Sequence, residues 1–224
     1  MPRPNLAELY PRLTAARVAT KHEAWLKGDV RQSYKTFAVQ PEDVALDIGA
    51  CVGWASLYLL DRGVSRVVAI EPAPQNYGRL CENLLGTNAK SVHGAVVGAG
   101  TSATVDLAVG GAACMHRLAS LGRVIRKRPV IAVPAIQWAT ALSLDAFTLV
   151  KVDVEGAEYL YDWTVIPISV REVVVEWHMM KKGEREKFQV AHLQLLSTGF
   201  VCTNTPSDRG KNWTTIGHYR RAPA

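Results

Sequence analysis

The fold of this chain is decided by the stretch VALDIGACVG, residues Val44–Gly53. Its apolar start is typical of a parallel strand covered on both faces, and the amphipathic run at 54–60 predicts a helix. The stretch therefore indicates a strand, a tight turn and a helix. Gly49 and Gly53 allow the backbone to approach a ligand and to direct helix N-terminal amides at it, while Asp47 offers an acceptor for a cationic or hydroxyl group.

Length and composition indicate an ordinary globular protein. The chain has 224 residues, enough for one domain with a sizeable core. Its apolar fraction is 48%, its charged fraction is 21%, and no apolar run approaches the ~20 residues of a membrane span. Charged residues interrupt the N-terminal region, which argues against a signal peptide. We expect a cytoplasmic protein with a helical extension at 1–36 and one globular domain at 37–224.

Cysteines and basic residues bear on redox state and partners. The four cysteines are scattered without a CxxC pair, which favours reduced thiols over a disulfide framework or a zinc site. The net charge of +6 is concentrated in three clusters, so nucleic acid remains open as a partner, and a solvated basic surface is the alternative. The clusters are Arg117, Arg123, Arg126, Lys127 and Arg128; Lys181, Lys182, Arg185 and Lys187; and Arg209, Lys211, Arg220 and Arg221.

Strand and helix patterns alternate along the rest of the chain. This order implies right-handed parallel crossovers and a doubly wound, Rossmann-like α/β sheet. The expected strands are 66–71, 91–97, 130–133, 147–153 and 171–178, with an excursion at 104–109 and a final antiparallel hairpin of 200–203 and 213–219. The expected helices are 5–28 (one helix or a pair), 77–85, 142–146 (a short helix or a turn) and 188–196, and residues 110–129 are expected to form a flap.

Acidic residues mark the ends of several expected strands. Glu71 falls roughly 20 residues after the glycine turn, the arrangement in which a carboxylate holds the ribose hydroxyls of an adenosine-containing ligand. The strand at 147–153 ends in Asp153 and is expected to turn directly into a helix that carries Glu155 and Glu158. Because carboxyl ends of parallel strands share one edge, these acids should gather there with the Glu176-Trp177-His178 end of the fifth strand.

These motifs together resemble the FkbM-type S-adenosylmethionine-dependent methyltransferases. The resemblance covers about residues 37–201 and is carried by the glycine turn, Glu71, the block KVDVEGAE at 151–158 and VVEWH at 174–178. It implies a class I methyltransferase fold, with a seven-stranded, mostly parallel sheet whose last strand is antiparallel. It also implies S-adenosylmethionine as cofactor, bound across the carboxyl ends of the first strands, and O-methylation of a hydroxyl on a sugar or another small metabolite.

The resemblance places the cofactor on named positions. The turn would hold the methionine end, Glu71 the ribose diol, and the residues just after the third strand would border the adenine. The expected cofactor-binding residues are Asp47, Gly49, Ala50, Gly53, Glu71, Pro72, Ala95, Val96 and Asp153.

Three residues are candidates for catalysis. Methyl transfer is an in-line displacement, so the enzyme chiefly aligns the nucleophile and helps to remove its proton. Asp153 is the first candidate for the base or orienting acceptor and His178 the second. Lys151 shares a strand face with Asp153 and would stabilise an anionic nucleophile or pair with an acid.

Each catalytic candidate has a structural alternative. The acids of the block favour a helix N-terminus on electrostatic grounds alone, and His178 would cap a strand end. His116, in the expected flap, is interpreted as an exposed loop histidine. A divalent cation between Asp153, Glu176 and His178 is chemically allowed, but without a denser oxygen cluster we expect a metal-free site.

Two other functions compete with O-methylation of a small molecule. The basic clusters suggest methylation of nucleic acid, such as an RNA ribose or cap. However, the Asn/Asp-Pro-Pro-aromatic sequence of base methyltransferases is absent after the fourth strand, and the fifth strand ends in His178 where ribose methyltransferases generally use lysine. The other function is a non-catalytic module that binds an adenosine ligand. The Asp-x-Gly-x-x-x-Gly spacing counts against a dinucleotide-binding oxidoreductase.

Overall fold

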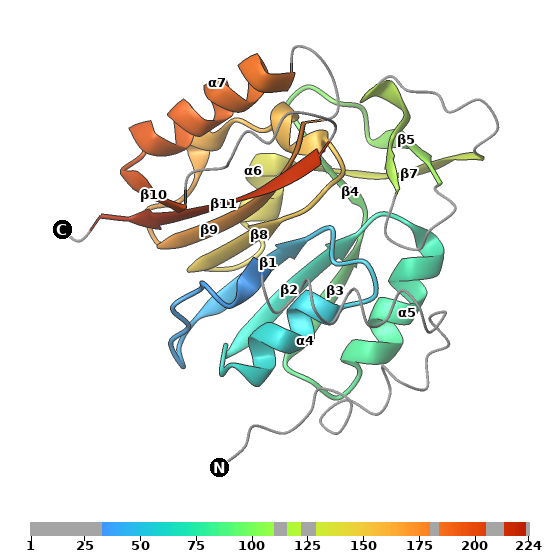
Figure 1. Cartoon of the computed structure of the whole chain (residues 1–224). Helices are drawn as coiled ribbons and strands as arrows, with labels where there is room; N and C mark the ends of the chain where they lie inside the picture. Colours follow the sequence, from blue (N-terminus) through green and yellow to red (C-terminus); the bar gives the residue numbers. More distant parts are fainter. Residues whose placement is uncertain (1–32, 110–115, 122–128, 180–183, 205–212, 223–224) are drawn as a thin grey trace.

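The computed structural model describes residues 33–109, 116–121, 129–179, 184–204 and 213–222 (Figure 1). Their main sheet has seven strands in the order β10-β11-β9-β8-β1-β2-β3. Strands β3, β2, β1, β8 and β9 pair in parallel, and β11 runs antiparallel to both β9 and β10. The bounds are β10 Phe200–Asn204, β11 Trp213–Arg221, β9 Glu172–Met179, β8 Leu149–Val152, β1 Val44–Ile48, β2 Arg66–Glu71 and β3 Ala89–His93. The doubly wound sheet with its antiparallel last strand is confirmed.

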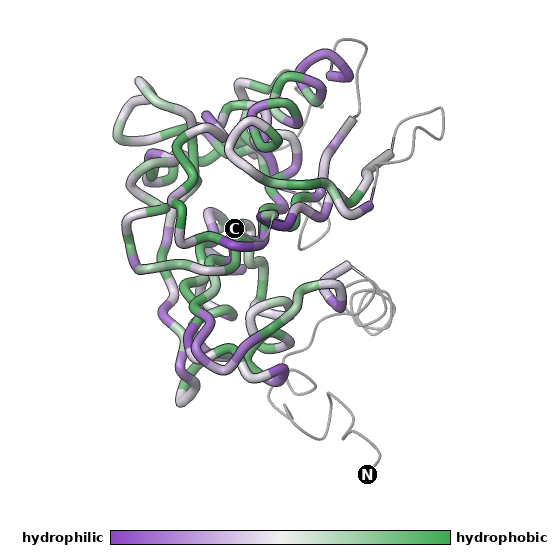
Figure 2. Tube along the Cα trace, turned by 90° about the vertical axis from the view of Figure 1, so that its left-hand side faces the viewer, coloured by the Kyte–Doolittle hydropathy of each residue, from purple (hydrophilic) through white to green (hydrophobic). Residues whose placement is uncertain are grey.

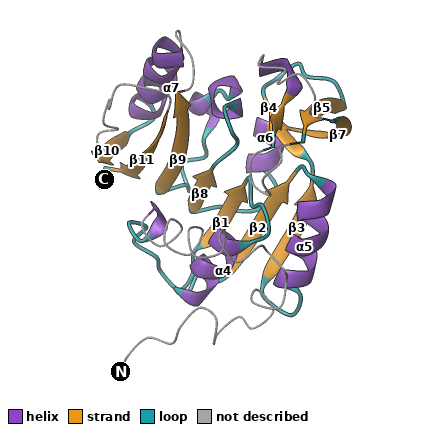
Figure 3. Cartoon of the chain, turned by 45° about the vertical axis from the view of Figure 1, so that its right-hand side comes forward, coloured by secondary structure: helices purple, strands orange, loops and turns teal. Residues whose placement is uncertain are grey.

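Helices cover both faces of this sheet (Figures 1 and 3). Alternate residues of β1 divide between the faces: Ala45 packs with α4 and α5, whereas Leu46 and Ile48 pack with α6 and α7. Period-two alternation with both faces buried explains the nearly continuous apolar run of this strand. The helices that lie wholly within the described residues are α4 Trp54–Asp61, α5 Pro74–Leu84, α6 Trp138–Leu142 and α7 Glu184–Ser197.

A second sheet of four strands stands beside the first, in the order β4-β7-β5-β6. Its strands are β4 Ala95–Val97, β5 Thr104–Ala108, β6 Arg117–Leu118 and β7 Val130–Gln137. The described residues also include the short 3-10 turns η1 Ala119–Leu121, η2 Ala157–Leu160 and η3 Trp163–Val165. A small core of its own, which includes Leu107, Leu118 and Val133, holds this sheet together. Figure 2 shows the apolar segments in green, alternating with polar ones in purple along the described part of the trace.

The structure corrects four of the expected elements. The strand expected at 91–97 is divided at Gly94, where a Cβ atom would lie 2.8 Å from Ile136 Cδ1, and its second half joins the other sheet as β4. The strand expected at 130–133 continues through Pro134 to Gln137, because β7 changes its partner from β5 to β4 at that proline, which has no N–H to donate.

The other two corrections concern helices. Of the short helix or turn expected at 142–146, a turn is present from residue 143, whereas the helix lies earlier, as α6, because β7 runs directly into it. The helix expected after Asp153 is only the 3-10 turn η2, which begins after Gly156 in a left-handed conformation (φ +104°).

The N-terminal helix expected at 5–28 lies outside the described residues, as do 110–115 and 122–128 of the expected flap. The first described residues are part of the core, since Tyr34 and Phe37 are buried beside α4. In the described part of the chain, no helix combines the length and the apolar character needed to cross a membrane.

Candidate cofactor cleft and acidic cluster

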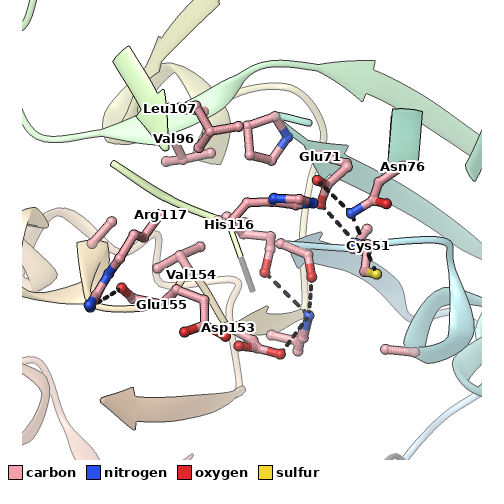
Figure 4. Close-up of a pocket in the computed structure, with 18 of the residues that line it drawn as sticks. Cys51, Glu71, Asn76, Val96, Leu107, His116, Arg117, Asp153, Val154 and Glu155 are labelled. Carbon is pink, nitrogen blue, oxygen red and sulfur yellow. Dashed lines mark hydrogen bonds and ion pairs between the residues drawn. The ribbon is translucent and has the colours of Figure 1, made fainter. Parts of the chain in front are cut away.

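A cleft of about 840 Å³, partly open to solvent, lies at the carboxyl ends of β1, β2 and β8 (Figure 4). Its lining comes from the turn after β1, the end of β2, strands β4 and β5, the start of β6 and the segment after β8. This is the edge at which open α/β sheets bind their ligands. Seven of the nine expected cofactor-binding residues line the cleft: Gly49, Ala50, Glu71, Pro72, Ala95, Val96 and Asp153.

Gly49 closes the turn against the segment after β8. Its φ is +74°, and a Cβ atom there would lie 1.7 Å from the backbone oxygen of Asp153. Gly49 N and Ala50 N both donate to Ile70 O at 3.0 Å, which fastens the turn to β2. Only glycine fits this close approach of two chain segments, so the conformation at Gly49 is set by contact as well as by backbone freedom.

Asp47 and Gly53, the other two expected cofactor contacts, do not line the cleft. Asp47 is fully buried; Ser56 Oγ donates to its Oδ2 at 2.7 Å and Lys151 Nζ lies 2.9 Å from its Oδ1. Gly53 precedes α4 and packs against Leu80. Both residues shape the turn from behind and do not form the cleft wall.

Lys151 is buried beneath the turn. Its Nζ donates to Gly49 O at 2.8 Å and to Ile48 O at 3.3 Å, and lies 3.8 Å from Asp153 Oδ2. Burial lowers the pKa of Lys151, but the charges of Asp47 and Asp153 outweigh it and raise the pKa above its usual value. Lys151 therefore remains an ammonium that binds the turn to β8, and it also lines the cleft.

Glu71 presents a carboxylate at the end of β2. Cys51 N donates to its Oε2 at 2.9 Å, and Ala73 N donates to its Oε1, also at 2.9 Å. Asn76 Nδ2 is 3.5 Å from the same Oε1. Burial raises the pKa of Glu71 to about 7, against these hydrogen bonds, so the carboxyl group changes charge near neutral pH. Asn76 and Cys51 line the cleft too, although the sequence did not single out Asn76.

Cys51 departs from the expectation of reduced thiols. It is engaged in a disulfide, whereas Cys81 and Cys202 are free. The scattered positions of the four cysteines in the sequence did not indicate this disulfide. Cys51 also has a positive φ of 52°, which is uncommon outside glycine, and it shares this feature with Glu155 (φ 55°) across the cleft.

Part of the cleft lining comes from β6 and the segment before it. His116, which the sequence placed in an exposed loop, is half-buried and lines the cleft. The neighbouring Arg117 donates from Nη2 to Glu155 O at 2.9 Å. From the sequence, Arg117 was only one member of a basic cluster. Its place in the cleft depends on the pairing of β6 with β5, in which Leu118 lies opposite Leu107, and the sequence does not reveal this pairing.

The other described members of the basic clusters make different contacts. In the third cluster, Arg220 lies 3.3 Å from the buried carboxylate of Glu172, and Arg221 donates to the backbone oxygens of Val170 and Pro167. These two arginines therefore hold the end of the sheet together. Most remaining members of the clusters lie outside the described residues.

Glu158 and His178 form a buried pair behind the cleft. Glu158 Oε1 accepts from His178 N at 2.7 Å and lies 3.2 Å from His178 Nδ1, while its Oε2 accepts from Gly156 N. Burial lowers the pKa of His178, but Glu158, Asp153 and Glu155 outweigh it and raise the pKa to about 10. His178 is only 2% exposed and does not line the cleft, so it is not placed to touch a molecule there.

Asp153 connects this buried pair with the cleft. Its side chain is 30% exposed and lines the cleft, with Oδ1 3.9 Å from His178 Nε2. Glu176 also faces the histidine, and single ligand atoms of Asp153, Glu176 and His178 lie within 4.8 Å of one another. Glu155 lines the cleft beside them, and its burial raises its pKa. The acids expected at this sheet edge are therefore together.

Comparison with protein families gives one match. The model described as "Methyltransferase FkbM domain" matches residues 47–202, which is more than half of the chain. The matched range begins in β1 and ends in β10, so it includes every strand end that borders the cleft. No curated protein matches the chain significantly.

Solved structures with similar folds share little sequence with the chain. A precorrin-6y C5,15-methyltransferase from Geobacter metallireducens is 14% identical, over 86% of this chain and 87% of that one, with a TM-score of 0.48. Fibrillarin from Aeropyrum pernix, solved with S-adenosyl-L-methionine, is 10% identical over 86% and 74%, with a TM-score of 0.48. A TehB-like methyltransferase from Corynebacterium glutamicum is 14% identical over 97% of both chains, with a TM-score of 0.45.

Proposed function

Because this chain belongs to the FkbM methyltransferase family, whose cofactor is S-adenosylmethionine, we propose that it methylates a hydroxyl oxygen of a sugar or another small metabolite. The family establishes the cofactor and the type of enzyme. The acceptor is the part that we infer from the cleft.

The cleft fits the cofactor on three observations. The backbone of the turn at Gly49 and Ala50 lines the cleft, where a ligand would meet it closely. Glu71 offers two carboxylate oxygens for a ribose diol. The apolar Pro72, Ala95 and Val96, which also line the cleft, suit the face of an adenine ring. When bound, S-adenosylmethionine supplies an electrophilic methyl group whose departure leaves a neutral thioether.

The position of Asp153 carries the proposal for a hydroxyl acceptor. Its backbone carbonyl packs on Gly49, while its carboxylate remains partly exposed on the cleft wall. An acceptor hydroxyl that donates a hydrogen bond to this carboxylate would be held beside the turn, with its lone pairs free for in-line attack. Lys151, which is committed to Asp47, supports the carboxylate from below and leaves it able to accept.

The opposite wall suggests the kind of acceptor. His116 and Arg117 bring hydrogen-bond donors to the cleft, and Arg117 has a buried Nε with no hydrogen-bond partner in the described part of the chain. Donors facing carboxylates suit a polyhydroxylated molecule, or one with an anionic group on the Arg117 side. Nucleic acid is the second candidate acceptor, because the sequence contains clusters of basic residues. Arg220 and Arg221 do not support it, since Arg220 pairs with Glu172 and Arg221 donates to a backbone oxygen.

The experiment is a methyl-transfer screen with S-adenosylmethionine labelled in its methyl group. Separate pools of sugars, other hydroxylated metabolites and RNA are incubated with the purified chain, and label in each pool is counted. We expect label in a small hydroxylated compound, at an ether-linked methyl group. Label only in RNA would replace our proposal by the second candidate, and cofactor binding without label in any pool would favour a binding module.

A further inference from the structure

We propose that Asp153, Glu176 and His178 form a binding site for a divalent transition-metal cation such as Mn²⁺, beside the cofactor cleft. The sequence favoured a metal-free site because three separated residues gave no dense oxygen cluster. The fold brings these three together from the ends of two adjacent strands, β8 and β9.

The spacing of the three residues suits a cation. His178 Nε2 lies 3.9 Å from Asp153 Oδ1 and 4.0 Å from Glu176 Oε1, and the three ligand atoms are all within 4.8 Å of one another. Ligands about 2.2 Å from a common cation lie up to about 4.4 Å apart. A cation therefore fits between them after a movement of a few tenths of an ångström. The distances of 3.9 and 4.0 Å from His178 Nε2 to these carboxylate oxygens are too long for direct hydrogen bonds.

The orientation of His178 is the second, independent observation. The side chain is 2% exposed, and Glu158 Oε1 accepts from its Nδ1 at 3.2 Å. Its Nε2 is directed at the carboxylates and has no hydrogen-bond partner among the described residues. A carboxylate that fixes one ring nitrogen while the other faces a cation is the usual arrangement around a metal-bound histidine.

The charges around the histidine favour a dication in the same place, where it would displace the proton that Nε2 carries in the imidazolium form. Glu155 Oε2 lies 3.7 Å from His178 Nε2, so it adds a third carboxylate on that side. The ammonium of Lys151 does not neutralise these acids, because its Nζ lies 2.9 Å from Asp47 Oδ1 but 3.8 Å from Asp153 Oδ2. It also donates to two backbone oxygens. One imidazole with several carboxylates is a donor set for borderline divalent cations, whereas Mg²⁺ prefers oxygen and water alone.

The site would serve the reaction through Asp153, which belongs to both the cluster and the cleft wall. A cation there would orient and polarise an acceptor oxygen beside the cofactor. This role rests on the proposed function, but the existence of the site does not. The two are therefore tested by different measurements.

The test is a titration of the chelator-treated full chain with MnCl2, in which the electron paramagnetic resonance signal of free Mn²⁺ reports binding. We expect one bound Mn²⁺ per chain, with affinity reduced about tenfold or more in Asp153→Asn and Glu176→Gln. Glu158→Gln should weaken binding by about 10- to 100-fold through the orientation of His178. Glu82→Gln, which changes an exposed acid on α5, is the matched control and should bind as the wild type does.

Two results would overturn the site. One is the absence of stoichiometric Mn²⁺ binding in a folded wild-type chain, and the other is unchanged binding in both Asp153→Asn and Glu176→Gln. Glu176 is half-buried, so its variant should fold, and circular dichroism checks this. Binding of S-adenosylhomocysteine is measured on the same samples. Cofactor binding and methyl transfer by a folded chain that does not bind Mn²⁺ would refute the cation site alone, whereas Mn²⁺ binding without transfer to any acceptor would refute the proposed function alone.

Discussion

Lys151 Nζ lies 2.9 Å from Asp47 Oδ1, and the two side chains are 2% and 0% exposed. The residues face each other across the parallel pairing of β1 with β8, so the ion pair joins the two central strands directly below the cleft. This buried pair supports the glycine turn and gives the first prediction.

Removing one partner of this pair should destabilise the fold. In Lys151→Met the carboxylate of Asp47 remains buried without its counter-charge, and we expect a loss of about 3–5 kcal/mol in the free energy of unfolding. The double variant Lys151→Met/Asp47→Leu should recover part of it. Arg66→Met, which breaks the exposed pair with Asp145, is the control and should cost at most about 1 kcal/mol. Urea denaturation measures all three, and a loss in Lys151→Met as small as in the control would contradict the role of the pair.

Alanine variants of Gly49 and Gly86 should distinguish the effect of a steric clash from that of backbone strain. Their φ angles are +74° and +78°, but only at Gly49 would a Cβ atom meet another group, Asp153 O at 1.7 Å. We expect Gly86→Ala to lose about 1–2 kcal/mol of stability with cofactor binding unchanged. Gly49→Ala should lose more stability and most affinity for S-adenosylhomocysteine. Isothermal titration calorimetry measures the affinity of each variant for S-adenosylhomocysteine. Equal affinities in the two variants would show that the turn does not border the ligand.

Cofactor affinity should depend on pH through Glu71, whose pKa is about 7. Only the ionised carboxylate accepts from both ribose hydroxyls, so affinity for S-adenosylhomocysteine should fall as pH falls below 7, by up to about tenfold per pH unit. For stability the sign is opposite. A pKa raised from 4.5 in the unfolded chain favours the folded state at low pH, and this contribution is lost as pH rises through 7.

Glu71→Gln provides the comparison, because its amide does not titrate. Its affinity should be weaker at pH 8 and nearly flat between pH 6 and 8. If wild type and Glu71→Gln showed the same pH profile, Glu71 would not be the titrating contact.

Asp153→Asn should separate catalysis from cofactor binding. The substitution keeps the backbone carbonyl that packs on Gly49, so affinity for S-adenosylhomocysteine should remain within about threefold. Methyl transfer to the acceptor found in the screen should fall by about 100-fold or more, because the carboxylate that orients the hydroxyl is lost. Asp106→Asn, an exposed acid on β5, is the control and should keep wild-type turnover. Turnover of Asp153→Asn equal to that control would remove Asp153 from the reaction.

The sequence was most informative where a strand is buried on both faces. The strand expected at 66–71 has the bounds of β2, and Glu71 lies at its end as predicted, because apolar pattern and spacing are local properties. Gly94 was missed as a break because the apolar run continues through it. Only pairing of β4 with β7, some 40 residues along the chain, directs its second half into another sheet.

Residues of the cleft were predicted when they closely follow a parallel strand of the main sheet, as Ala95 and Val96 follow β3, and were missed when β6 or the residue before it supplies them. His116 and Arg117 reach the wall through the β5–β6 pairing, which no short-range pattern announces. Asp47, in contrast, was predicted to contact the ligand but does not line the cleft. A strand-end acid next to glycines suggested a ligand contact, but its register opposite Lys151 turns the side chain into the core.

The most direct test of the account is isothermal titration of the purified chain with S-adenosylhomocysteine at pH 8, with NAD and ATP as controls and Glu71→Ala as the variant. We predict saturable binding of S-adenosylhomocysteine alone, near one equivalent, and an affinity at least about tenfold weaker in Glu71→Ala. Equal affinity in the variant, or no binding to the wild type, would contradict the assignment of this cleft to the cofactor.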